Sequence, residues 1–281
     1  MSAEKREALL YRAGPLQNGY NPIVDSGNSD LRLLEFGRIR LEKTQEFRTS
    51  TEEREACLAF LSGTGEVDIN GANFESAAYG AIGDRKSVFH GNPCMVYAPR
   101  KAELHVKAVS RELHAALLTA PARRDTRPFV VMGDQLERVS FGTSNWRREA
   151  CIALGDEKDV DRLLVGETYN MPGSWSSYPP HKHDESKEPN EEPYEEIYFF
   201  MMDPEDGFGM QRIYTGKGAA HPIDEALVVQ NGDTVVIPRG YHPVVAGAGY
   251  RLYYLWALAG EERRFGSWSD DPRHTWIRTL E

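Results

Sequence analysis

Three histidines and one glutamate in the second half of the chain have the types and the spacing of a metal site. His181 and His183 are separated by one residue, Glu196 begins an apolar run, and His242 follows a Pro-Arg-Gly turn. Residues i and i+2 of a β-strand point to the same face, so both imidazoles of the pair can reach one ion. Three neutral nitrogens and one carboxylate suit a divalent transition metal such as Zn, Mn, Fe, Co or Ni, and an octahedral ion would keep positions open for chemistry. The residue types therefore predict a catalytic metal centre.

The histidine pair alone does not decide between a metal site and a polar loop. Asp184 and Glu185 follow the pair directly, as they would in a solvated loop. A later segment favours the metal site, because the β-branched run at 234–237 ends in a turn that presents His242.

One of two adjacent glutamates must supply the carboxylate. Because side chains alternate along a strand, Glu195 and Glu196 point to opposite faces. Glu196 directly opens the apolar strand and shares a face with Tyr198 and Phe200. We therefore assign Glu196 to the metal and expect Glu195 to be solvated or to support a ligand.

A His-x-His pair, a glutamate and a later histidine after a Pro-x-Gly turn together resemble the ligand pattern of cupin barrels. Two features differ from that pattern. The second block is one residue shorter after Gly240, and a long polar insert at 184–193 separates His183 from Glu196.

The elements that must position these residues indicate an all-β fold with few short helices. The chain has 281 residues, 40% of them hydrophobic, with 25 glycines and 16 prolines between short β-branched or aromatic runs. This composition allows a large core and leaves few segments long enough for an amphipathic helix, although residues 3–11 could form a short one. The dipeptides Asn70-Gly71 and Asn231-Gly232 favour type I′ turns, so we expect a hairpin at each.

The two halves of the chain are similar to each other. VYAPR at 96–100 matches VVIPR at 235–239, and EACLAF at 55–60 loosely matches EIYFF at 196–200. This similarity indicates an internal duplication.

The duplication predicts two cupin barrels, of which one binds metal. Superposing the Pro-Arg pairs puts Glu103 at the position of His242, and no His-x-His pair precedes Glu55. We therefore expect a degenerate barrel without metal at residues 1–125 and a metal-binding barrel with a C-terminal tail at residues 126–281.

Charge and hydropathy argue against several classes of partner. The formal net charge is -10 and no block of Lys and Arg stands out, so the electrostatic footprint of a nucleic-acid-binding protein is missing. Residues 1–7 contain no apolar signal-peptide core, and nowhere do about eighteen apolar residues run together. We expect a cytoplasmic protein without membrane contact, whose partner is a small molecule.

Longer motifs are similar to the 5-deoxyglucuronate isomerase family of myo-inositol catabolism. They are SYPPHKHD at 177–184, EEIY at 195–198, GYHP at 240–243, GYRLYYLW at 249–256 and DDPRHTW at 270–276. The resemblance extends over nearly the full length and is strongest from Ser174 onward. It implies a two-barrel cupin that converts 5-deoxy-D-glucuronate, a sugar acid, into 5-dehydro-2-deoxy-D-gluconate, an aldose to ketose isomerisation without a redox cofactor.

The residue chemistry is compatible with this reaction. If the C1 carbonyl and the C2 hydroxyl of the substrate chelate the metal, the C2 hydrogen becomes more acidic, and a base can move it to C1 through a cis-enediol. The sequence does not identify that base. Tyr178, Tyr241 and Tyr253 lie close in sequence to the ligands or on the last long strand, and each could equally be a rim or core residue.

Two arginines are candidates for the carboxylate of the substrate, since a planar guanidinium matches a carboxylate with two hydrogen bonds. Arg239 lies in the turn before His242, and Arg251 lies in an aromatic strand. Either could instead be an exposed surface charge.

Three other functions remain open at this point. They are a related uronate ketol-isomerase of pectin breakdown, an iron-dependent cupin dioxygenase, and a non-catalytic sugar-binding cupin. Long β-sheet edges and the tail that carries Trp268 and Trp276 also favour a homo-oligomer, although the tail could fold back over its own barrel.

Overall fold

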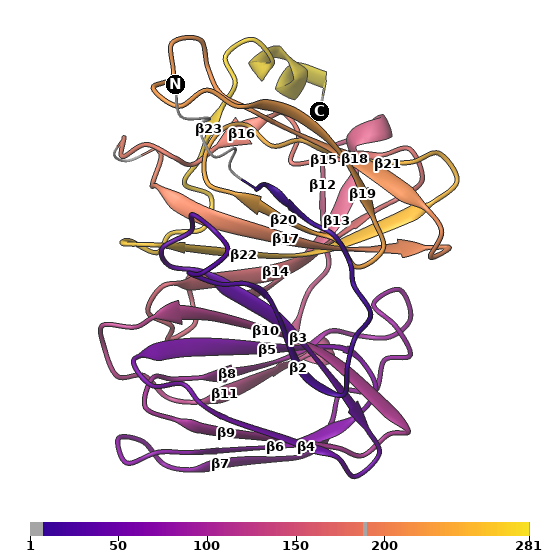
Figure 1. Cartoon of the computed structure of the whole chain (residues 1–281). Coiled ribbons are helices and arrows are strands. Elements are labelled where there is room, and N and C mark those ends of the chain that lie inside the picture. Colours follow the sequence, from indigo (N-terminus) through magenta and orange to yellow (C-terminus); the bar gives the residue numbers. More distant parts are fainter. Residues whose placement is uncertain (1–7, 188–189, 281) are drawn as a thin grey trace, which may run out of the picture.

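Two stacked β-barrels make up the computed structural model of the chain, which describes residues 8–187 and 190–280 (Figure 1). Each barrel has one large and one smaller antiparallel sheet, and the two large sheets pack against each other in the middle of the molecule. The helices of the described part are three short 3₁₀ segments, Gly133–Gln135, Ser144–Trp146 and Thr275–Leu280. The predicted all-β, two-barrel fold is confirmed. No helix in these residues has the length and the apolar character needed to cross a membrane.

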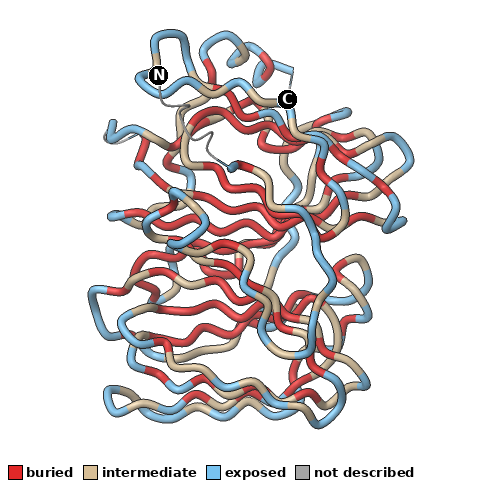
Figure 2. The backbone as a smooth tube through the Cα atoms, viewed as in Figure 1, coloured by how far each residue is buried: buried red, intermediate tan, exposed pale blue. Residues whose placement is uncertain are grey.

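The N-terminal barrel contains a six-stranded and a four-stranded sheet. Across the larger sheet the order is β11 (Phe129–Met132), β8 (Cys94–Ala98), β5 (Arg54–Ser62), β10 (Glu112–Pro121), β3 (Glu35–Glu42) and β2 (Gly19–Val24). Across the smaller sheet it is β4 (Glu46–Ser50), β9 (Glu103–Ala108), β6 (Gly65–Asn70) and β7 (Ala77–Ile82). The strands of both sheets contain many buried residues (Figure 2). The apolar core of this barrel includes Ile39, Leu58, Phe60, Val67 and Val106.

The C-terminal barrel contains a seven-stranded and a four-stranded sheet. Across the larger sheet the order is β1 (Leu10–Tyr11), β20 (Thr234–Ile237), β17 (Tyr194–Asp203), β22 (Arg251–Gly260), β14 (Leu163–Asn170), β13 (Arg148–Leu154) and β12 (Val139–Phe141). Across the smaller sheet it is β15 (Trp175–Ser176), β21 (Val244–Ala246), β18 (Phe208–Tyr214) and β19 (Asp224–Gln230). A separate ribbon pairs β16 (His181–Lys182) with β23 (Ser269–Asp270).

The long apolar strand β17 is buried on both of its faces. Phe199 points toward the first barrel, where its ring lies 5.5 Å from that of Phe36. Glu196 and Tyr198, on the opposite face, line the interior of the second barrel. A strand covered on both sides needs no alternation of polar and apolar residues, which accounts for the continuous apolar run after Glu196.

The register of the two large sheets shows which residues of the halves correspond. Ala98 lies opposite Ala56, as Ile237 lies opposite Glu196. Ala98 and Ile237 both precede the Pro-Arg pairs, so Ala56 takes the place of Glu196. The sequence match that aligned Glu55 with Glu196 was therefore wrong by one residue, and Glu55 corresponds to Glu195.

Glu55 and Glu195 make equivalent contacts across the interface between the barrels. The buried carboxylate of Glu55 accepts hydrogen bonds from three successive backbone amides, those of Asp161, Arg162 and Leu163, at 2.9, 2.7 and 2.8 Å. In the same way, the carboxylate of Glu195 in the second barrel accepts hydrogen bonds from three backbone amides of the first barrel, those of Arg32, Leu33 and Leu34, at 2.7, 2.8 and 3.3 Å. Each barrel thus provides a carboxylate that accepts hydrogen bonds from backbone amides of the other barrel.

A buried ion pair also joins the barrels. Arg85, in the loop after β7, donates to both carboxylate oxygens of Glu167 on β14, at 2.9 and 2.7 Å, and both side chains are fully buried. Tyr169 and Tyr253 donate their hydroxyls to the same carboxylate. Tyr253, predicted as a catalytic candidate, therefore belongs to the barrel interface.

The two halves exchange strands at their ends. β11 lies beyond residue 125 but pairs with β8 of the first barrel, and β1 pairs with β20 of the second. The division at residue 125 stays a prediction. Most of the short helix expected at residues 3–11 falls outside the described residues, and Leu10–Tyr11 at its end is strand β1.

The two Asn-Gly dipeptides reverse the chain, but neither forms a two-residue hairpin. β6 and β7 do pair with each other, through a longer loop after Asn70. β19 and β20 lie in different sheets, and Gly232, with φ of 86°, turns the chain from one to the other. The side-chain oxygen of Asn231 accepts the amide of Met202, so this turn is held against β17.

Candidate metal centre

Three of the four predicted ligands converge on one point inside the second barrel. Glu196 Oε2 lies 3.0 Å from His183 Nε2 and 3.2 Å from His242 Nε2. The ligand atoms of all three buried residues lie within 4.8 Å of one another. Glu196 is on β17, His183 follows β16, and His242 follows the turn after β20.

The two imidazoles are oriented by backbone carbonyls. His183 Nδ1 lies 3.3 Å from Tyr194 O, and His242 Nδ1 lies 2.9 Å from Gly240 O. A carbonyl can only accept, so each Nδ1 carries a hydrogen and each Nε2 faces the carboxylate of Glu196, where it could offer a lone pair to a metal ion. His242 Nε2 is buried without a hydrogen-bond partner. A buried lone pair that faces a carboxylate is what a divalent metal ion would satisfy, so the donor set fits such an ion.

Burial and mutual charge set the protonation of the site. Burial lowers the pKa of His242 to about 3. Burial also disfavours the charged form of His183, but the hydrogen bond to Glu196 and the charge of that carboxylate outweigh it and raise the pKa of His183. Without metal, His183 therefore keeps its second proton more readily than a free imidazole does, and an incoming cation must displace that proton.

His181 lies beside this cluster without joining it. Its ring centroid is 4.8 Å from that of His242 and 6.4 Å from that of His183, and it leans on Trp268 at 5.1 Å. Burial, followed by the charge of His183, lowers its pKa to about 3, so the ring is neutral. Its role as the fourth ligand stays a prediction.

The turn that presents His242 requires a glycine. Gly240 has φ of 89°, and a Cβ there would lie 2.6 Å from Tyr214 O. This close approach arises because Tyr214 and Tyr241 exchange backbone hydrogen bonds of 2.9 and 2.8 Å. The Pro-Arg-Gly sequence thus fixes the position from which His242 reaches the cluster.

The polar insert is tied to the ligand turn by a charged network. Lys182 donates to Asp184, and its Nζ lies 2.8 Å from Glu191 and 3.1 Å from Glu185. Asp184 Oδ2 in turn accepts the amide of Gly240 at 2.7 Å. A chain of hydrogen bonds therefore runs from the insert through Gly240 to the ring of His242.

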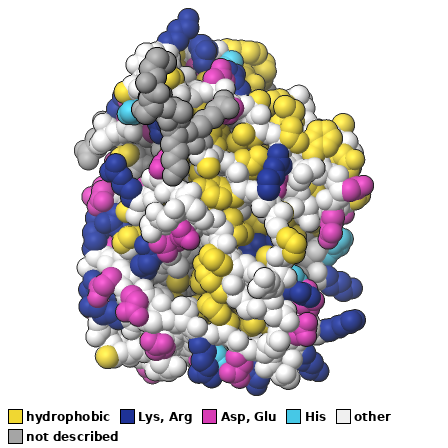
Figure 3. All heavy atoms as spheres, in the orientation of Figure 1, with side chains coloured by type: hydrophobic (Ala, Val, Ile, Leu, Met, Phe, Trp, Pro, Cys, Tyr) yellow, Lys and Arg dark blue, Asp and Glu magenta, His cyan; other side chains and the backbone are white. Residues whose placement is uncertain are grey.

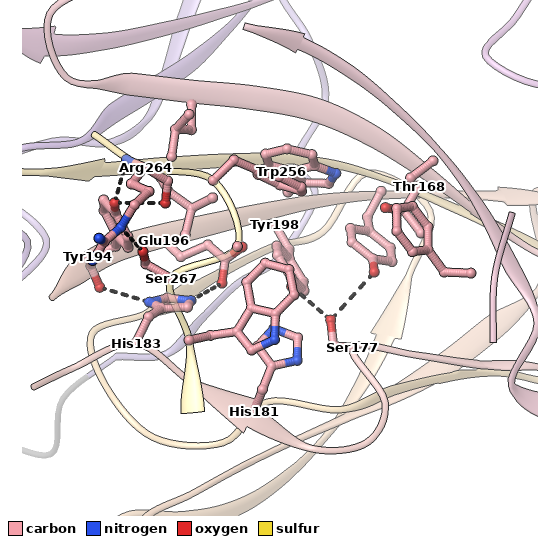
Figure 4. Close-up of a pocket in the computed structure, with 18 of the residues that line it drawn as sticks. Thr168, Ser177, His181, His183, Tyr194, Glu196, Tyr198, Trp256, Arg264 and Ser267 are labelled. Carbon is pink, nitrogen blue, oxygen red and sulfur yellow. Dashed lines mark hydrogen bonds and ion pairs between the residues drawn. The ribbon is translucent and has the colours of Figure 1, made fainter. Parts of the chain in front are cut away.

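A cavity opens from the cluster along the inner face of the large sheet (Figure 4). Its polar lining includes hydroxyl groups and two arginines, and its walls are aromatic. The lining residues include Phe141, Arg148, Thr168, Ser177, Tyr198, Tyr254, Trp256, Arg264 and Trp268. Gly166 lets the indole of Trp256 lie flat on the sheet, because a Cβ there would meet Trp256 Cζ2 at 2.2 Å.

Three hydroxyl groups meet next to the carboxylate ligand. Ser177 Oγ lies 2.9 Å from the hydroxyl of Tyr198 and 3.5 Å from that of Tyr254. Burial, together with the charge of Glu196, raises the pKa of Tyr198 well above its ordinary value. Its phenol thus keeps its proton beside Glu196. The sequence carried a signal for it, because Tyr198 lies two residues after Glu196 on the same face of β17.

The other predicted functional residues lie elsewhere. Arg239 donates to the carbonyl of His221 at 3.0 Å and lines a separate groove. Arg251 donates to Asp203 at 2.8 Å and lies over the ring of Phe89.

The predicted tyrosines are likewise not among the residues that line the cavity. Tyr178 packs against Trp146 and Trp175, and Tyr241 packs against Tyr214. The structure instead places Tyr198, Tyr254, Arg148 and Arg264 in the cavity, and apart from Tyr198 no local sequence signal marks them.

Comparison with known proteins identifies the family. A model of the KduI/IolB family matches residues 9–277. The chain belongs to this family. Among its KduI/IolB relatives, the 5-deoxy-glucuronate isomerase of Geobacillus thermodenitrificans (strain NG80-2) is 37% identical over 270 residues, which are 96% of this chain and 95% of that protein. The 5-deoxy-glucuronate isomerase of Bacillus subtilis (strain 168) is 34% identical over 256 residues, 90% of this chain and 91% of the relative.

Solved structures agree with the assignment to the KduI/IolB family. An IolB-like protein from Salmonella typhimurium LT2 superposes with a TM-score of 0.87 at 30% identity, covering 96% of this chain and 99% of that one. The oxalate decarboxylase of Lactobacillus farciminis has a TM-score of 0.70 at 10% identity, covering 99% and 92%, and shows likeness of fold alone.

Proposed function

We propose that the protein is a metal-dependent aldose–ketose isomerase that converts 5-deoxy-D-glucuronate into 5-dehydro-2-deoxy-D-gluconate in myo-inositol catabolism. The observation that carries this proposal is the convergence of His183, Glu196 and His242 at the end of a hydroxyl-lined cavity. Relatives at 34–37% identity that are named 5-deoxy-glucuronate isomerase support the choice of reaction.

His181, His183, Glu196 and His242 would hold one divalent metal ion, Zn, Mn, Fe, Co or Ni. His181 is included because its neutral ring lies against that of His242. A metal bound there would act as a Lewis acid that polarises the C1 carbonyl and the C2 hydroxyl.

The chain's own residues would then position the sugar acid and manage its protons. The isomerisation moves one hydrogen from C2 to C1 and one from the C2 oxygen to the C1 oxygen, so no electron acceptor is needed. Tyr198 keeps its proton because of burial, and it is placed to donate to a substrate oxygen next to Glu196. Ser177 and Tyr254 complete a hydroxyl network that can orient the polyol, and the indoles of Trp256 and Trp268 restrict water.

The deciding experiment follows the conversion of 5-deoxy-D-glucuronate by NMR. The protein is stripped of metal and then resupplied with Mn, Zn, Fe, Co or Ni. We expect conversion only after metal is restored, and the His183→Ala variant should lose both metal and turnover.

Other outcomes would contradict the proposal. Turnover by the metal-free variant would refute the mechanism. Conversion of the unsaturated-uronate product of pectin breakdown, but not of 5-deoxy-D-glucuronate, would favour the related ketol-isomerase. Metal-dependent oxygen uptake would indicate a dioxygenase, and binding of sugar without any reaction would indicate a sugar-binding cupin.

We also propose self-association through the outer face of the smaller C-terminal sheet. Phe208 and Met210 on β18 and Val228 on β19 are exposed there. Hydrophobic side chains gather in the same region of the surface (Figure 3). Sedimentation of the wild type and of a Met210→Lys variant tests this, and an unchanged molecular mass would exclude this face.

A further inference from the structure

The strand that carries His181 is held in place by the C-terminal tail. Among the described residues β16 pairs with β23 alone, in a two-stranded ribbon that belongs to neither sheet of the second barrel. In this ribbon His181 lies opposite Asp270, and Lys182 lies opposite Ser269. An isolated two-stranded ribbon is only marginally stable in water. The position of His181 therefore depends on how the tail is fixed.

The tail is anchored on both sides of β23. Before it, the amide of Arg264 donates to the hydroxyl of Tyr194 at 2.9 Å, and that hydroxyl donates to the carbonyl of Arg264 at 3.1 Å. After it, buried Asp271 donates its amide to the carbonyl of Pro180 at 2.7 Å and accepts the hydroxyl of Tyr214 at 2.8 Å. Tyr194 begins β17 and Tyr214 ends β18, so both sheets of the second barrel hold the tail.

A row of aromatic rings connects the large sheet to His181. Trp256 on β22 stacks on Phe265 with the ring centroids 5.7 Å apart, and Phe265 meets the indole of Trp268 edge-on, also at 5.7 Å. Trp268 in turn lies against the ring of His181, with the centroids 5.1 Å apart and the planes inclined by 32°. All four side chains line the cavity. The tail thus places a flat indole against the imidazole.

This indole can fix the plane of the imidazole. The last side-chain torsion of histidine is broad, so neighbouring groups decide how the ring is turned. A hydrogen bond to the backbone of Pro179 holds one edge of the His181 ring, and Trp268 limits rotation about that edge. In this orientation the ring of His181 lies 4.8 Å from that of His242, close to the 5.0 Å between the rings of His183 and His242. His181 is therefore as near to His242 as His183 is.

We propose that Trp268 is a positioning residue of the metal centre, which stacks on His181 and keeps that ring turned toward His242. The proposal rests on the proposed function, in which His181 is the fourth ligand of one divalent ion. A neighbour that orients a metal ligand contributes about 10–100-fold to metal affinity. The C-terminal tail then belongs to the metal centre, although none of its residues is a proposed ligand.

The first test is a double-mutant cycle on the affinity for Co²⁺, measured by competition with a chelator. We expect Trp268→Ala in the full-length protein to bind Co²⁺ roughly 10–100-fold more weakly than the wild type. In the His181→Ala background the same replacement should change the dissociation constant by less than about twofold, because the ring that Trp268 orients is gone. Losses that simply multiply would overturn the proposal.

Replacements of different shape separate stacking from the filling of space. Trp268→Phe keeps a flat ring against His181 and should restore most of the affinity, whereas Trp268→Leu fills much of the volume without a flat face and should not. Thermal unfolding of each variant shows whether it is folded, and the comparison of Phe with Leu stands even if Trp268→Ala does not fold. Equal affinity of the Phe and Leu variants would refute stacking as the cause.

Trp276→Ala is the matched control in the same tail. Trp276 lies in the 3₁₀ segment Thr275–Leu280 and is 58% exposed. This variant should bind Co²⁺ like the wild type. A loss as large as that in Trp268→Ala would show that any disturbance of the tail weakens the site, and the specific role of Trp268 would be refuted.

The visible absorption spectrum of bound Co²⁺ reports its ligands directly. We expect the spectrum of Co²⁺-loaded Trp268→Ala to shift from that of the wild type toward that of His181→Ala. An unchanged spectrum in Trp268→Ala would overturn the proposal. Neither measurement needs turnover, so the isomerase assignment can fail while this proposal holds. If His181→Ala itself binds Co²⁺ like the wild type, His181 is not a ligand and the role of Trp268 falls with it.

Discussion

Removing Asp184 should weaken metal binding without removing a ligand. Its carboxylate accepts the amide of Gly240 at 2.7 Å, and the carbonyl of Gly240 accepts the Nδ1 hydrogen of His242 at 2.9 Å. In Asp184→Ala the amide of Gly240 loses its charged hydrogen-bond acceptor. The turn, and with it the orientation of the His242 ring toward Glu196, is then less well fixed. Loss of a group that orients a metal ligand typically costs 10–100-fold in affinity, which is about 1.4–2.7 kcal/mol. A charged hydrogen bond contributes about 1.5–3 kcal/mol, so the contact is strong enough to account for this loss.

Glu185 offers the matched control for this experiment. It also pairs with Lys182, at 3.1 Å, but it is half exposed and the structure shows no bond from it to Gly240. Competition of each variant with a chelator for Co²⁺ or Zn²⁺ gives the dissociation constants. Glu185→Ala should bind metal like the wild type. Equal loss in both variants, or less than a threefold loss in Asp184→Ala, would refute the reasoning.

Three other perturbations follow from buried contacts. Arg85→Met leaves the carboxylate of Glu167 buried without its cation, so the free energy of unfolding in urea should fall by about 3–5 kcal/mol. Replacing both residues by Met should lower it much less. An unchanged free energy of unfolding in the single variant would contradict this. In Gly166→Ala the added Cβ meets the indole of Trp256 and the backbone oxygen of Cys151. We expect the indole to shift into the cavity, a cost of about 1–3 kcal/mol in stability and a lower kcat/KM; unchanged kinetics would show that the indole does not enter the cavity. Burial holds the pKa of His242 near 3 in the folded protein, below its ordinary 6.5, so folding favours the neutral ring. The free energy of unfolding of the metal-free protein should therefore be highest above about pH 6.5 and fall by about 2 kcal/mol by about pH 5. Equal urea midpoints at about pH 7 and about pH 5 would contradict this.

Local sequence rules select three residues that converge in the candidate metal centre. The Pro-x-Gly turn selects His242, strand alternation selects Glu196, and the His-x-His pair supplies His183; the structure brings these three together. The same i, i+2 spacing also selects His181, which lies beside the cluster. Alternation also separated Glu195 from Glu196 correctly, because the backbone periodicity of a strand is fixed by geometry. The same alternation predicts that Tyr198, two residues after Glu196, also faces the cavity, as the structure shows.

Contacts between distant strands could not be read from the sequence in this way. Arg251 faces Asp203 because β22 pairs with β17, which lies far from it in the chain, and no local pattern encodes this pairing. Matching Glu55 with Glu196 failed for a related reason, since a shift of one residue moves every side chain to the other face. Only the register, with Ala56 opposite Ala98, corrects it.

The reciprocal contacts of Glu55 and Glu195 limit how this protein can be taken apart. A fragment that contains only the second barrel would leave three adjacent amides, at residues 161–163, without their acceptor, and would expose the face that carries Phe199. The half that has Ala56 at the position equivalent to Glu196 thus supports the other half structurally. Transplanting the second barrel into another protein therefore requires a designed substitute for this support, with a carboxylate at the position of Glu55.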